Sequence, residues 1–209
     1  MEIMTGSGAA RVELDQPEGA TFLLVLTHGA GGGVDSKDLL ATRQAGLGLG
    51  GAVARVLQPY RVRGARAPGS PERQDAAWLE IIEWLRPEFP EIPLVQGGRS
   101  NGARLACRTA RRAAARAVVA LAFPLHPPGR PERSRADELR GAGVDVLVVN
   151  GARDPFGIPS RTDAARVVVL PGETHALARN PERVGQAVAA WLGEVLGLGS
   201  GQAGRRAGA

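Results

Sequence analysis

The sequence predicts an α/β fold in which a mostly parallel central sheet is covered by helices on both faces. Short apolar runs of strand length alternate along the chain with longer stretches whose apolar residues recur at helical spacing. The runs are apolar at nearly every position, as strands buried on both faces of a parallel sheet require. In such sheets the loops at the carboxyl ends of the strands carry the functional residues.

Six apolar runs are predicted to be the strands of this sheet. Val, Leu and Ala dominate them, and turn-forming residues bound most of them. They lie at residues 21–27, 52–58, 92–95, 117–122, 144–150 and 166–170.

Two helices are predicted in the first half of the chain. The first, over residues 39–45, has Asp35 or Ser36 available as its N-cap. The second, over residues 70–85, begins with serine at the N-cap and proline at the first helical position. The basic, Gly- and Pro-bearing residues 60–69 between them are expected to be a loop.

Three helices are predicted in the second half. One follows residue 100 directly and runs to about residue 115, and a short polar one is centred on residues 136–140. The last runs from residue 180 to residue 195 and has one apolar face.

The chain length of 209 residues and its hydrophobic content of 44% suit one domain, expected over residues 20–196. Residues 1–19 are polar and glycine-rich, so they are expected to be a flexible segment or to carry a short edge strand around Val12 and Leu14. The Gly-, Ala- and Arg-rich residues 197–209 are expected to be a disordered tail.

The net charge of +5 and the isoelectric point of about 10.7 raise the question of a nucleic-acid partner. Lys37 is the only lysine, and the abundance of Arg, Ala, Gly and Pro is typical of GC-rich coding. The arginines are scattered and are not interleaved with the aromatic residues that stack on bases. We therefore expect no nucleic-acid partner.

Cys107 is the only cysteine, which excludes an internal disulfide and a metal site with two cysteines. We expect it to be a small buried residue, and we expect neither a metal nor an organic cofactor. The apolar runs are too short to span a membrane, and the N-terminus has no leader pattern. A cytoplasmic protein without a membrane partner is expected, and the sequence leaves its oligomeric state open.

The pentapeptide Gly98-Arg99-Ser100-Asn101-Gly102 reads G-x-S-x-G and lies between a predicted strand and a predicted helix. In that context the motif predicts a nucleophile elbow, a sharp turn that pushes the serine hydroxyl out of the sheet. The glycines leave room for the two backbones that crowd the turn. The alternative is a plain turn between two buried elements, but we predict that Ser100 is a nucleophile.

A serine hydroxyl needs a base, usually a histidine that a carboxylate orients. Ser100 is followed by Asp154 after a later strand and by His175 after the last strand, which is the order found in α/β-hydrolases. All three are predicted at carboxyl ends of strands. We therefore predict a triad of Ser100, Asp154 and His175.

Each partner also has a simpler interpretation. Asp154 precedes Pro155 and suits an ordinary turn, and His175 suits a surface loop. Asp137 and Asp145 are rival acids, but one lies in a helix-like stretch and the other begins its strand, at the wrong end of the sheet.

The glycine-rich residues 28–33 follow the first buried strand. We predict an oxyanion hole formed by the N–H of Asn101 and by an N–H of Ala30 or Gly31. A phosphate-binding loop is the alternative for this stretch. The stretch lacks the lysine and hydroxyl of G-x-x-x-x-G-K-[ST] and the spacing of G-x-G-x-x-G, so no nucleotide is expected.

Four segments together resemble the α/β-hydrolase superfamily, namely residues 27–32, 98–104, 123–129 and 150–157. Within it they look like the small, lidless dienelactone-hydrolase-like branch, which includes bacterial proteins akin to the testis-expressed and NSL-complex-subunit hydrolase-like proteins of animals. The resemblance covers about residues 20–195. Its most branch-specific piece is Pro-Leu-His-Pro-Pro-Gly, within the third segment.

The resemblance implies a serine hydrolase that cleaves an ester or related acyl bond of a small molecule through an acyl-enzyme. The branch also contains scaffolds, so the alternative is a non-catalytic interaction protein that keeps the elbow because the fold needs the turn. Dienelactone hydrolases use a cysteine nucleophile, and their substrate is therefore not carried over to a chain with Ser100.

Residues 123–136 occupy the place where such folds insert a lid, and here the segment is short. We therefore expect an open, shallow site suited to small or protruding substrates. His28, Arg99 and His126 are expected either to line this site or to pack structurally.

Overall fold

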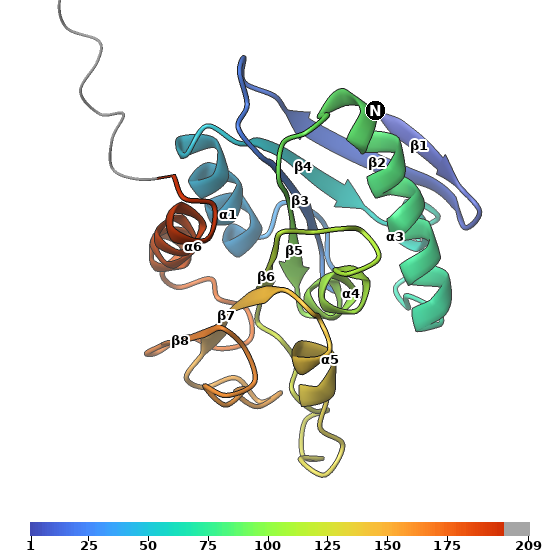
Figure 1. The fold of residues 1–209 in the computed structure, drawn as a ribbon. Helices are drawn as coiled ribbons and strands as arrows, with labels where there is room; N and C mark the ends of the chain where they lie inside the picture. Colours follow the sequence, from blue (N-terminus) through green and yellow to red (C-terminus); the bar gives the residue numbers. More distant parts are fainter. Residues whose placement is uncertain (199–209) are drawn as a thin grey trace, which may run out of the picture.

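The computed structural model describes residues 1–198, in which eight strands form one sheet in the order β1-β2-β4-β3-β5-β6-β7-β8 (Figure 1). β3 to β8 are parallel, whereas β1 and β2 are antiparallel additions at one edge. The strands are β1 (Glu2–Thr5), β2 (Gly8–Asp15), β3 (Leu23–Thr27), β4 (Ala52–Leu57), β5 (Leu94–Arg99), β6 (Ala117–Leu121), β7 (Asp145–Gly151) and β8 (Arg166–Leu170).

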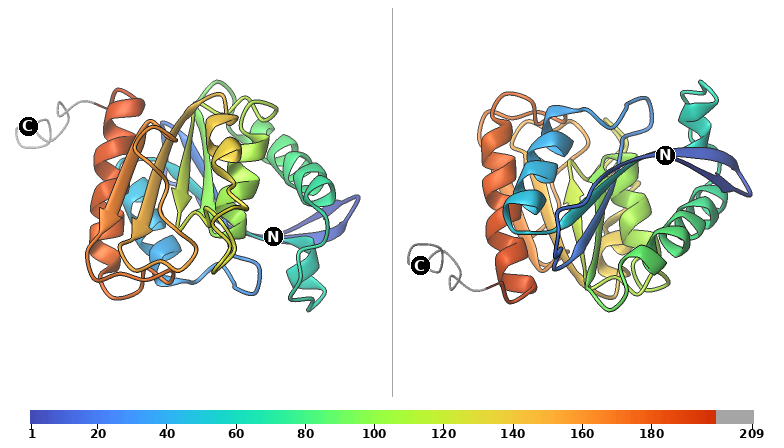
Figure 2. Two further views of the ribbon diagram at one scale, coloured as in Figure 1. Left: turned by 90° about the horizontal axis from the view of Figure 1, so that it is seen from below. Right: turned by 90° about the horizontal axis from the view of Figure 1, so that it is seen from above.

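Helices cover both faces of the sheet, as Figure 2 shows. α1 and α6 pack against each other on one face, and α3, α4 and α5 lie on the other. The helices are α1 (Lys37–Gly48), α2 (Pro59–Val62), α3 (Pro71–Leu85), α4 (Asn101–Thr109), α5 (Ala136–Arg140) and α6 (Pro181–Val195), and a 3₁₀ turn, η1 (Arg86–Glu88), follows α3. The predicted α/β fold is therefore confirmed.

Two apolar clusters lie on opposite faces of the sheet, and the central strands contribute to both. Leu23 and Val25 belong to the cluster under α3 and α4, whereas Leu24 and Leu26 belong to the cluster under α1 and α6. Successive strand residues point to opposite faces. This is why β3 is apolar at four successive positions, from Leu23 to Leu26.

The N-terminal residues form a hairpin, in which β1 pairs with β2 and β2 pairs with β4. The sequence suggested at most one edge strand here. Ile3, Ala10 and Val12 are buried in the cluster under α3, which orders both strands. β1 escaped prediction because it is four residues long and contains a single buried position.

Two predictions require correction, one of a loop and one of the end of a helix. Residues 60–69 were expected to be a loop, but α2 begins at Pro59, whose fixed φ suits the first helical position. The helix after Ser100 ends at Thr109 and not near residue 115. The chain continues in turns in which Ala114 has a positive φ of 50°.

α6 ends at Val195 and is followed by Gly197, which was predicted to belong to the disordered tail. Gly197 has a φ of 65°, and the Leu198 N–H donates to the Gly193 carbonyl at 2.9 Å. This is the pattern of a Schellman motif, for which glycine is favoured. The rest of the predicted tail, residues 199–209, lies outside the described residues.

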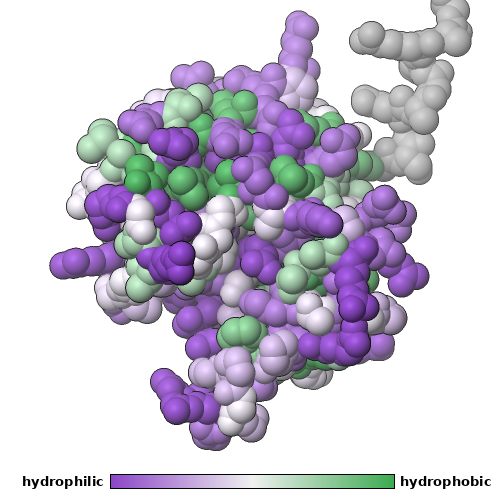
Figure 3. Space-filling view, turned by 180° about the vertical axis from the view of Figure 1, so that it is seen from behind, coloured by the Kyte–Doolittle hydropathy of each residue, from purple (hydrophilic) through white to green (hydrophobic). Residues whose placement is uncertain are grey.

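In the described part of the chain, residues 1–198, no lid domain covers the carboxyl edge of the sheet, because residues 122–135 contain neither helix nor strand. Among residues 1–198, none of the helices has the length and apolar character needed to cross a bilayer. Polar residues dominate the face seen in Figure 3, with small apolar groups between them.

Candidate active site

Ser100 lies in a sharp turn between β5 and α4. Its φ of 53° and ψ of −114° fall outside the regions that side-chain-bearing residues normally occupy. Its N–H donates to the Leu121 carbonyl of the neighbouring strand at 2.9 Å, which holds the turn at the end of the sheet. Strained backbone of this kind is common at functional sites.

The two glycines of the motif are needed because the backbone is crowded on both sides of Ser100. A Cβ on Gly98 would lie 2.5 Å from the Thr27 carbonyl oxygen. A Cβ on Gly102 would lie 2.7 Å from that oxygen and 2.8 Å from the His28 carbonyl oxygen. The elbow can therefore form only if both positions lack a side chain.

The structure brings Ser100, His175 and Asp154 together at the carboxyl edge. The Ser100 Oγ lies 3.0 Å from His175 Nε2, and His175 Nδ1 lies 2.9 Å from Asp154 Oδ2. The Asp154 side chain is fully buried, and the His175 side chain is 20% exposed. The buried carboxylate thus holds one edge of an imidazole whose other edge reaches the serine.

Besides His175, two other groups contact the Asp154 carboxylate. Its Oδ1 accepts a hydrogen bond from the Phe156 N–H at 2.9 Å, and Asn150 Nδ2 lies 3.4 Å from its Oδ2. The turn interpretation and the triad interpretation are therefore compatible. The Phe156 ring also lies against the His175 ring, with centroids 4.2 Å apart.

The rival acids lie elsewhere. The Asp137 side chain is 96% exposed and pairs with Arg140. Asp145 is the first residue of β7 and is exposed, at the opposite end of the strand from the Asp154 turn.

The glycine-rich loop after β3 comes directly against the serine, because a Cβ on Gly29 would lie 3.3 Å from the Ser100 Cβ. Within residues 1–198, the N–H groups of Ala30, Gly31 and Asn101 donate no hydrogen bond to the protein. Asn101 is the first residue of α4, where N–H groups have no partner inside the helix. These N–H groups are free to bind an oxygen atom beside Ser100.

The short helix α2 holds this loop in place. The Tyr60 hydroxyl donates to the Ala30 carbonyl at 2.9 Å, and Arg61 Nε donates to the Gly32 carbonyl at 2.9 Å. Burial raises the pKa of Tyr60 to about 12, so the phenol stays protonated as a donor. Neither residue was predicted from the sequence, in which Pro59 directly after a strand was the available signal.

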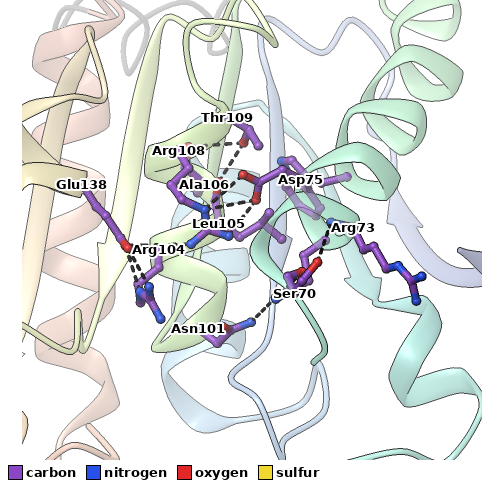
Figure 4. Close-up of polar contacts among 12 residues, drawn as sticks. Ser70, Arg73, Asp75, Asn101, Arg104, Leu105, Ala106, Arg108, Thr109 and Glu138 are labelled. Carbon is purple, nitrogen blue, oxygen red and sulfur yellow. Dashed lines mark hydrogen bonds and ion pairs between the residues drawn. The ribbon is translucent and has the colours of Figure 1, made fainter. Parts of the chain in front are cut away.

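Side-chain contacts of α4 attach it to its neighbours (Figure 4). Asn101 Nδ2 donates to Gln74 Oε1 of α3 at 2.7 Å. Arg104 makes two hydrogen bonds to Glu138 of α5, at 2.8 and 2.6 Å, and Arg108 pairs with Asp75 of α3. The helix that follows the nucleophile is thus tied on both sides.

Arg99 does not simply line the site. Its Nε donates to Asp38 Oδ2 at 2.8 Å, and its Nη2 donates to the His175 carbonyl oxygen at 2.8 Å. The Asp38 side chain is fully buried at the start of α1. Asp38 was not identified from the sequence, because nothing local connects it to residues sixty positions later.

His28 packs structurally. It is completely buried, its Nδ1 donates to the Gly29 carbonyl at 2.7 Å, and its Nε2 accepts from the Gln58 N–H at 3.0 Å. Burial lowers its pKa to about 4, so the ring is neutral at pH 7. Of the two alternatives expected for His28, lining the site or packing, these contacts fit packing.

His126 also has a packing role. Its Nδ1 donates to the Pro127 carbonyl at 2.9 Å, and a Cβ on Gly157 would lie 2.4 Å from its Nε2. The ring therefore packs against Gly157. Among the described residues, none of its hydrogen bonds reaches Ser100 or His175.

A cavity of about 600 Å³ lies between the N-terminal hairpin, residues 58–69 and α3, and Ser100 does not line it. Cys107 is buried, which raises the pKa of its thiol and leaves it a packing residue. Within residues 1–198, His, Cys, Asp and Glu form no group of three or more that is able to hold a metal ion.

Solved structures share this fold across nearly the whole chain. They include Est1E from Butyrivibrio proteoclasticus with ferulic acid bound (17% identity, TM-score 0.76, 94% of this chain and 99% of that one). XC6422 from Xanthomonas campestris, described as an α/β serine hydrolase without a lid, is similar at 20% identity (TM-score 0.72, 94% of each chain). A dienelactone hydrolase from Anabaena variabilis is similar at 19% identity (TM-score 0.74, 94% and 96%).

No sequence match to a curated protein accompanies these structural similarities. The finer resemblance to the testis-expressed and NSL-complex-subunit proteins stays a prediction. A family model described as an alpha/beta hydrolase domain matches residues 20–179, which include Ser100, Asp154 and His175. With the eight-stranded sheet and the elbow at its carboxyl edge, this match shows that the chain belongs to the α/β-hydrolase family.

Proposed function

We propose that the protein is a serine hydrolase that cleaves an ester or related acyl bond of a small molecule. The observation that carries this proposal is the continuous hydrogen-bonded path from Ser100 Oγ to His175 Nε2 (3.0 Å) and from His175 Nδ1 to Asp154 Oδ2 (2.9 Å). A serine, a base and an orienting carboxylate at these distances are the parts that acyl transfer requires.

In the first half of the reaction Ser100 Oγ bonds to the acyl carbon while His175 takes its proton. His175 then returns that proton to the leaving oxygen as the acyl–oxygen bond breaks, which leaves an acyl-enzyme. In the second half, water attacks the acyl carbon, and His175 takes a proton from it and gives it to Ser100 Oγ as the acid departs. Asp154 stabilises the imidazolium in both halves.

The negative oxygen of each tetrahedral intermediate is assigned to the N–H of Asn101 and to the N–H of Ala30 or Gly31. All three donors lack a protein partner within residues 1–198. Losing one such donor costs about 3 kcal/mol of transition-state stabilisation. Their attachment through Tyr60 and α4 keeps them in place before the charge develops.

Residues 122–135, where a lid would be inserted, form no helix or strand, and the open site that results favours small or protruding acyl groups. Ferulic acid, seen bound to Est1E from Butyrivibrio proteoclasticus, is a small aromatic acid, so an ester of ferulic acid is a sensible member of a substrate panel. Short p-nitrophenyl esters test the chemistry without assuming the natural leaving group.

A fluorophosphonate probe tests the proposal directly. The folded protein is expected to be labelled and to hydrolyse p-nitrophenyl acetate, and Ser100→Ala is expected to abolish both. Ser134→Ala, at an exposed serine outside the site, is the matched control and is expected to behave as wild type. If the folded protein shows neither labelling nor turnover, the enzyme proposal fails and a non-catalytic interaction protein remains.

A further inference from the structure

Arg99 connects the nucleophile turn to two distant parts of the chain. It is the last residue of β5 and directly precedes Ser100. Its guanidinium donates from Nε to Asp38 Oδ2 at 2.8 Å and from Nη2 to the His175 carbonyl oxygen at 2.8 Å. One planar group therefore joins the start of α1, the elbow and the loop that carries the histidine.

The histidine loop needs such an attachment. His175 follows β8, which is separated from β5 by β6 and β7, and residues 171–180 contain no helix or strand. Within the loop, the buried carboxylate of Glu173 accepts hydrogen bonds from the N–H groups of Arg179 and Asn180. The Arg99 bond fixes the backbone of His175.

This bond acts on the same pair of segments as the bond between Ser100 and His175. The Arg99 bond has an ionised donor, and such bonds are roughly twice as strong as those between neutral groups. The Arg99 guanidinium carries a full charge, and the Arg99 side chain is only 17% exposed. The bond therefore sets the position of the imidazole relative to Ser100 before substrate arrives.

Asp38 explains why a cation is tolerated here. His175 becomes positively charged during the proposed reaction, and a free guanidinium nearby would oppose that change. The Asp38 carboxylate is fully buried, accepts the Leu39 N–H at 3.0 Å through its other oxygen and offsets the charge of Arg99. The planar fork of arginine serves both acceptors at once, whereas a lysine ammonium lacks that geometry.

We propose that Arg99, held by Asp38, is a positioning residue that keeps His175 in hydrogen-bonding register with Ser100. The inference rests on the proposed function. It assigns Arg99 no contact with substrate, and so it predicts that the rate of covalent chemistry depends on Arg99 while the affinity for a small probe does not.

The test measures the maximal inactivation rate (kinact) and the probe affinity (KI) for a fluorophosphonate on wild type, Arg99→Met, Arg99→Lys and Asp38→Asn. We expect Arg99→Met to lower kinact by about 10²-fold, the effect of a misplacement of about 1 Å, and to change KI less than about 3-fold. Arg99→Lys keeps the charge and is expected to recover part of the rate. Asp38→Asn removes the negative charge that offsets Arg99 and is expected to slow kinact as well.

Arg43→Met is the matched control. Arg43 also makes two hydrogen bonds to a carboxylate, that of Asp15, its side chain is 28% exposed, and it lies on α1 as Asp38 does but bonds to neither the elbow nor the histidine loop. Its kinact is expected to stay within about 3-fold of wild type. Circular dichroism melts of all the variants establish that the folded fraction is the same at the assay temperature.

The outcomes separate two failures. If wild type is not labelled at Ser100, the proposed function fails. If wild type is labelled but folded Arg99→Met and Asp38→Asn react as fast as wild type, the positioning role is wrong. A fall in kinact for Arg43→Met as large as that for Arg99→Met would also overturn it, because loss of any ion pair would then suffice.

Discussion

At the scale of single residues, the site depends on backbone positions that tolerate one side chain or none. Ser100 holds a positive φ, and Gly98 and Gly102 face carbonyl oxygens at distances where a Cβ does not fit. The hydroxyl is exposed to the imidazole because the turn is this tight. Small changes at these positions are therefore expected to have large effects on both folding and chemistry.

Gly102→Ala tests this crowding. The new Cβ would meet two carbonyl oxygens at 2.7 and 2.8 Å, and we expect the free energy of unfolding to fall by about 1–3 kcal/mol. Urea denaturation measures it. Gly33→Ala, where a Cβ meets no atom within 4 Å, is the control and is expected to change stability by less than about 0.5 kcal/mol. Equal stability of Gly102→Ala and wild type would contradict the elbow geometry.

Asp154→Asn tests the orienting carboxylate. The variant keeps an oxygen for the Phe156 N–H but removes the charge that holds the Nδ1–H tautomer of His175. We expect turnover of p-nitrophenyl acetate to fall by about 10³–10⁴-fold, as in other serine triads. Asp137→Asn, at the exposed rival acid, is expected to leave the rate unchanged. The reverse pattern would show that the wrong acid has been assigned.

At the scale of elements, the four-residue helix α2 holds the glycine-rich loop in place. α2 brings Tyr60 to the carbonyl of Ala30 and Arg61 to that of Gly32. The loop itself has little structure of its own beyond the turn in which the Gly32 N–H donates to the Gly29 carbonyl. The loop conformation therefore depends on a neighbouring element.

Tyr60→Phe removes one of these attachments without changing the packing of the ring. We expect the free energy of unfolding to fall by about 1 kcal/mol, the net value of one hydrogen bond. Fluorophosphonate labelling is expected to slow several-fold, since Ala30 is a proposed donor to the oxyanion. Arg63→Gln, in the same segment but bonded to Ser7 in the N-terminal hairpin, is the control. An unchanged labelling rate in Tyr60→Phe would mean that the loop is held without Tyr60.

The sequence predicted the larger elements because burial on both faces leaves a strong local signal. β3 to β8 lie close to the predicted strands, and α3 begins at the predicted cap of Ser70. β1 and α2 were missed because each is four residues long, too short for a periodic pattern. Their order comes from contacts with α3 and with the glycine-rich loop, which no local pattern records.

The site follows the same rule. Ser100, Asp154 and His175 were suggested by a motif and by chain order, and the structure places them within hydrogen-bonding distance. Asp38 was not suggested, because its contact with Arg99 depends on how α1 packs against the end of β5. The sequence left open whether His28 lines the site or packs, because that choice depends on its burial, which no local pattern gives.

At the scale of the whole molecule, His28 makes stability depend on pH. Burial lowers its pKa from 6.5 to about 4 in the folded state, so the unfolded chain binds a proton more readily between those values. Stability contributed by the neutral ring is therefore complete above pH 6.5 and is lost as the pH falls towards 4. Each pKa unit corresponds to about 1.4 kcal/mol, which gives a loss of about 2 kcal/mol at pH 5.

Urea denaturation at pH 7.5 and pH 5.0 measures this term by comparing wild type with His28→Gln. The variant is expected to lose about 2 kcal/mol less stability than wild type between the two pH values, whatever its stability at pH 7.5. An identical pH dependence in the two proteins would show that His28 is not held neutral by burial.

The proposed reaction passes through an acyl-enzyme on Ser100, so trapping that species is the sharpest test of the enzyme proposal. Wild-type protein mixed with p-nitrophenyl acetate is quenched in acid within the burst phase and analysed by intact-protein and peptide mass spectrometry. We predict one acetyl group, located on Ser100, which accumulates more slowly in Asp154→Asn and is absent from Ser100→Ala. Release of p-nitrophenol from the folded protein with no acetyl group on Ser100, or with the group on another residue, would show that the reaction does not proceed through an acyl-enzyme on Ser100.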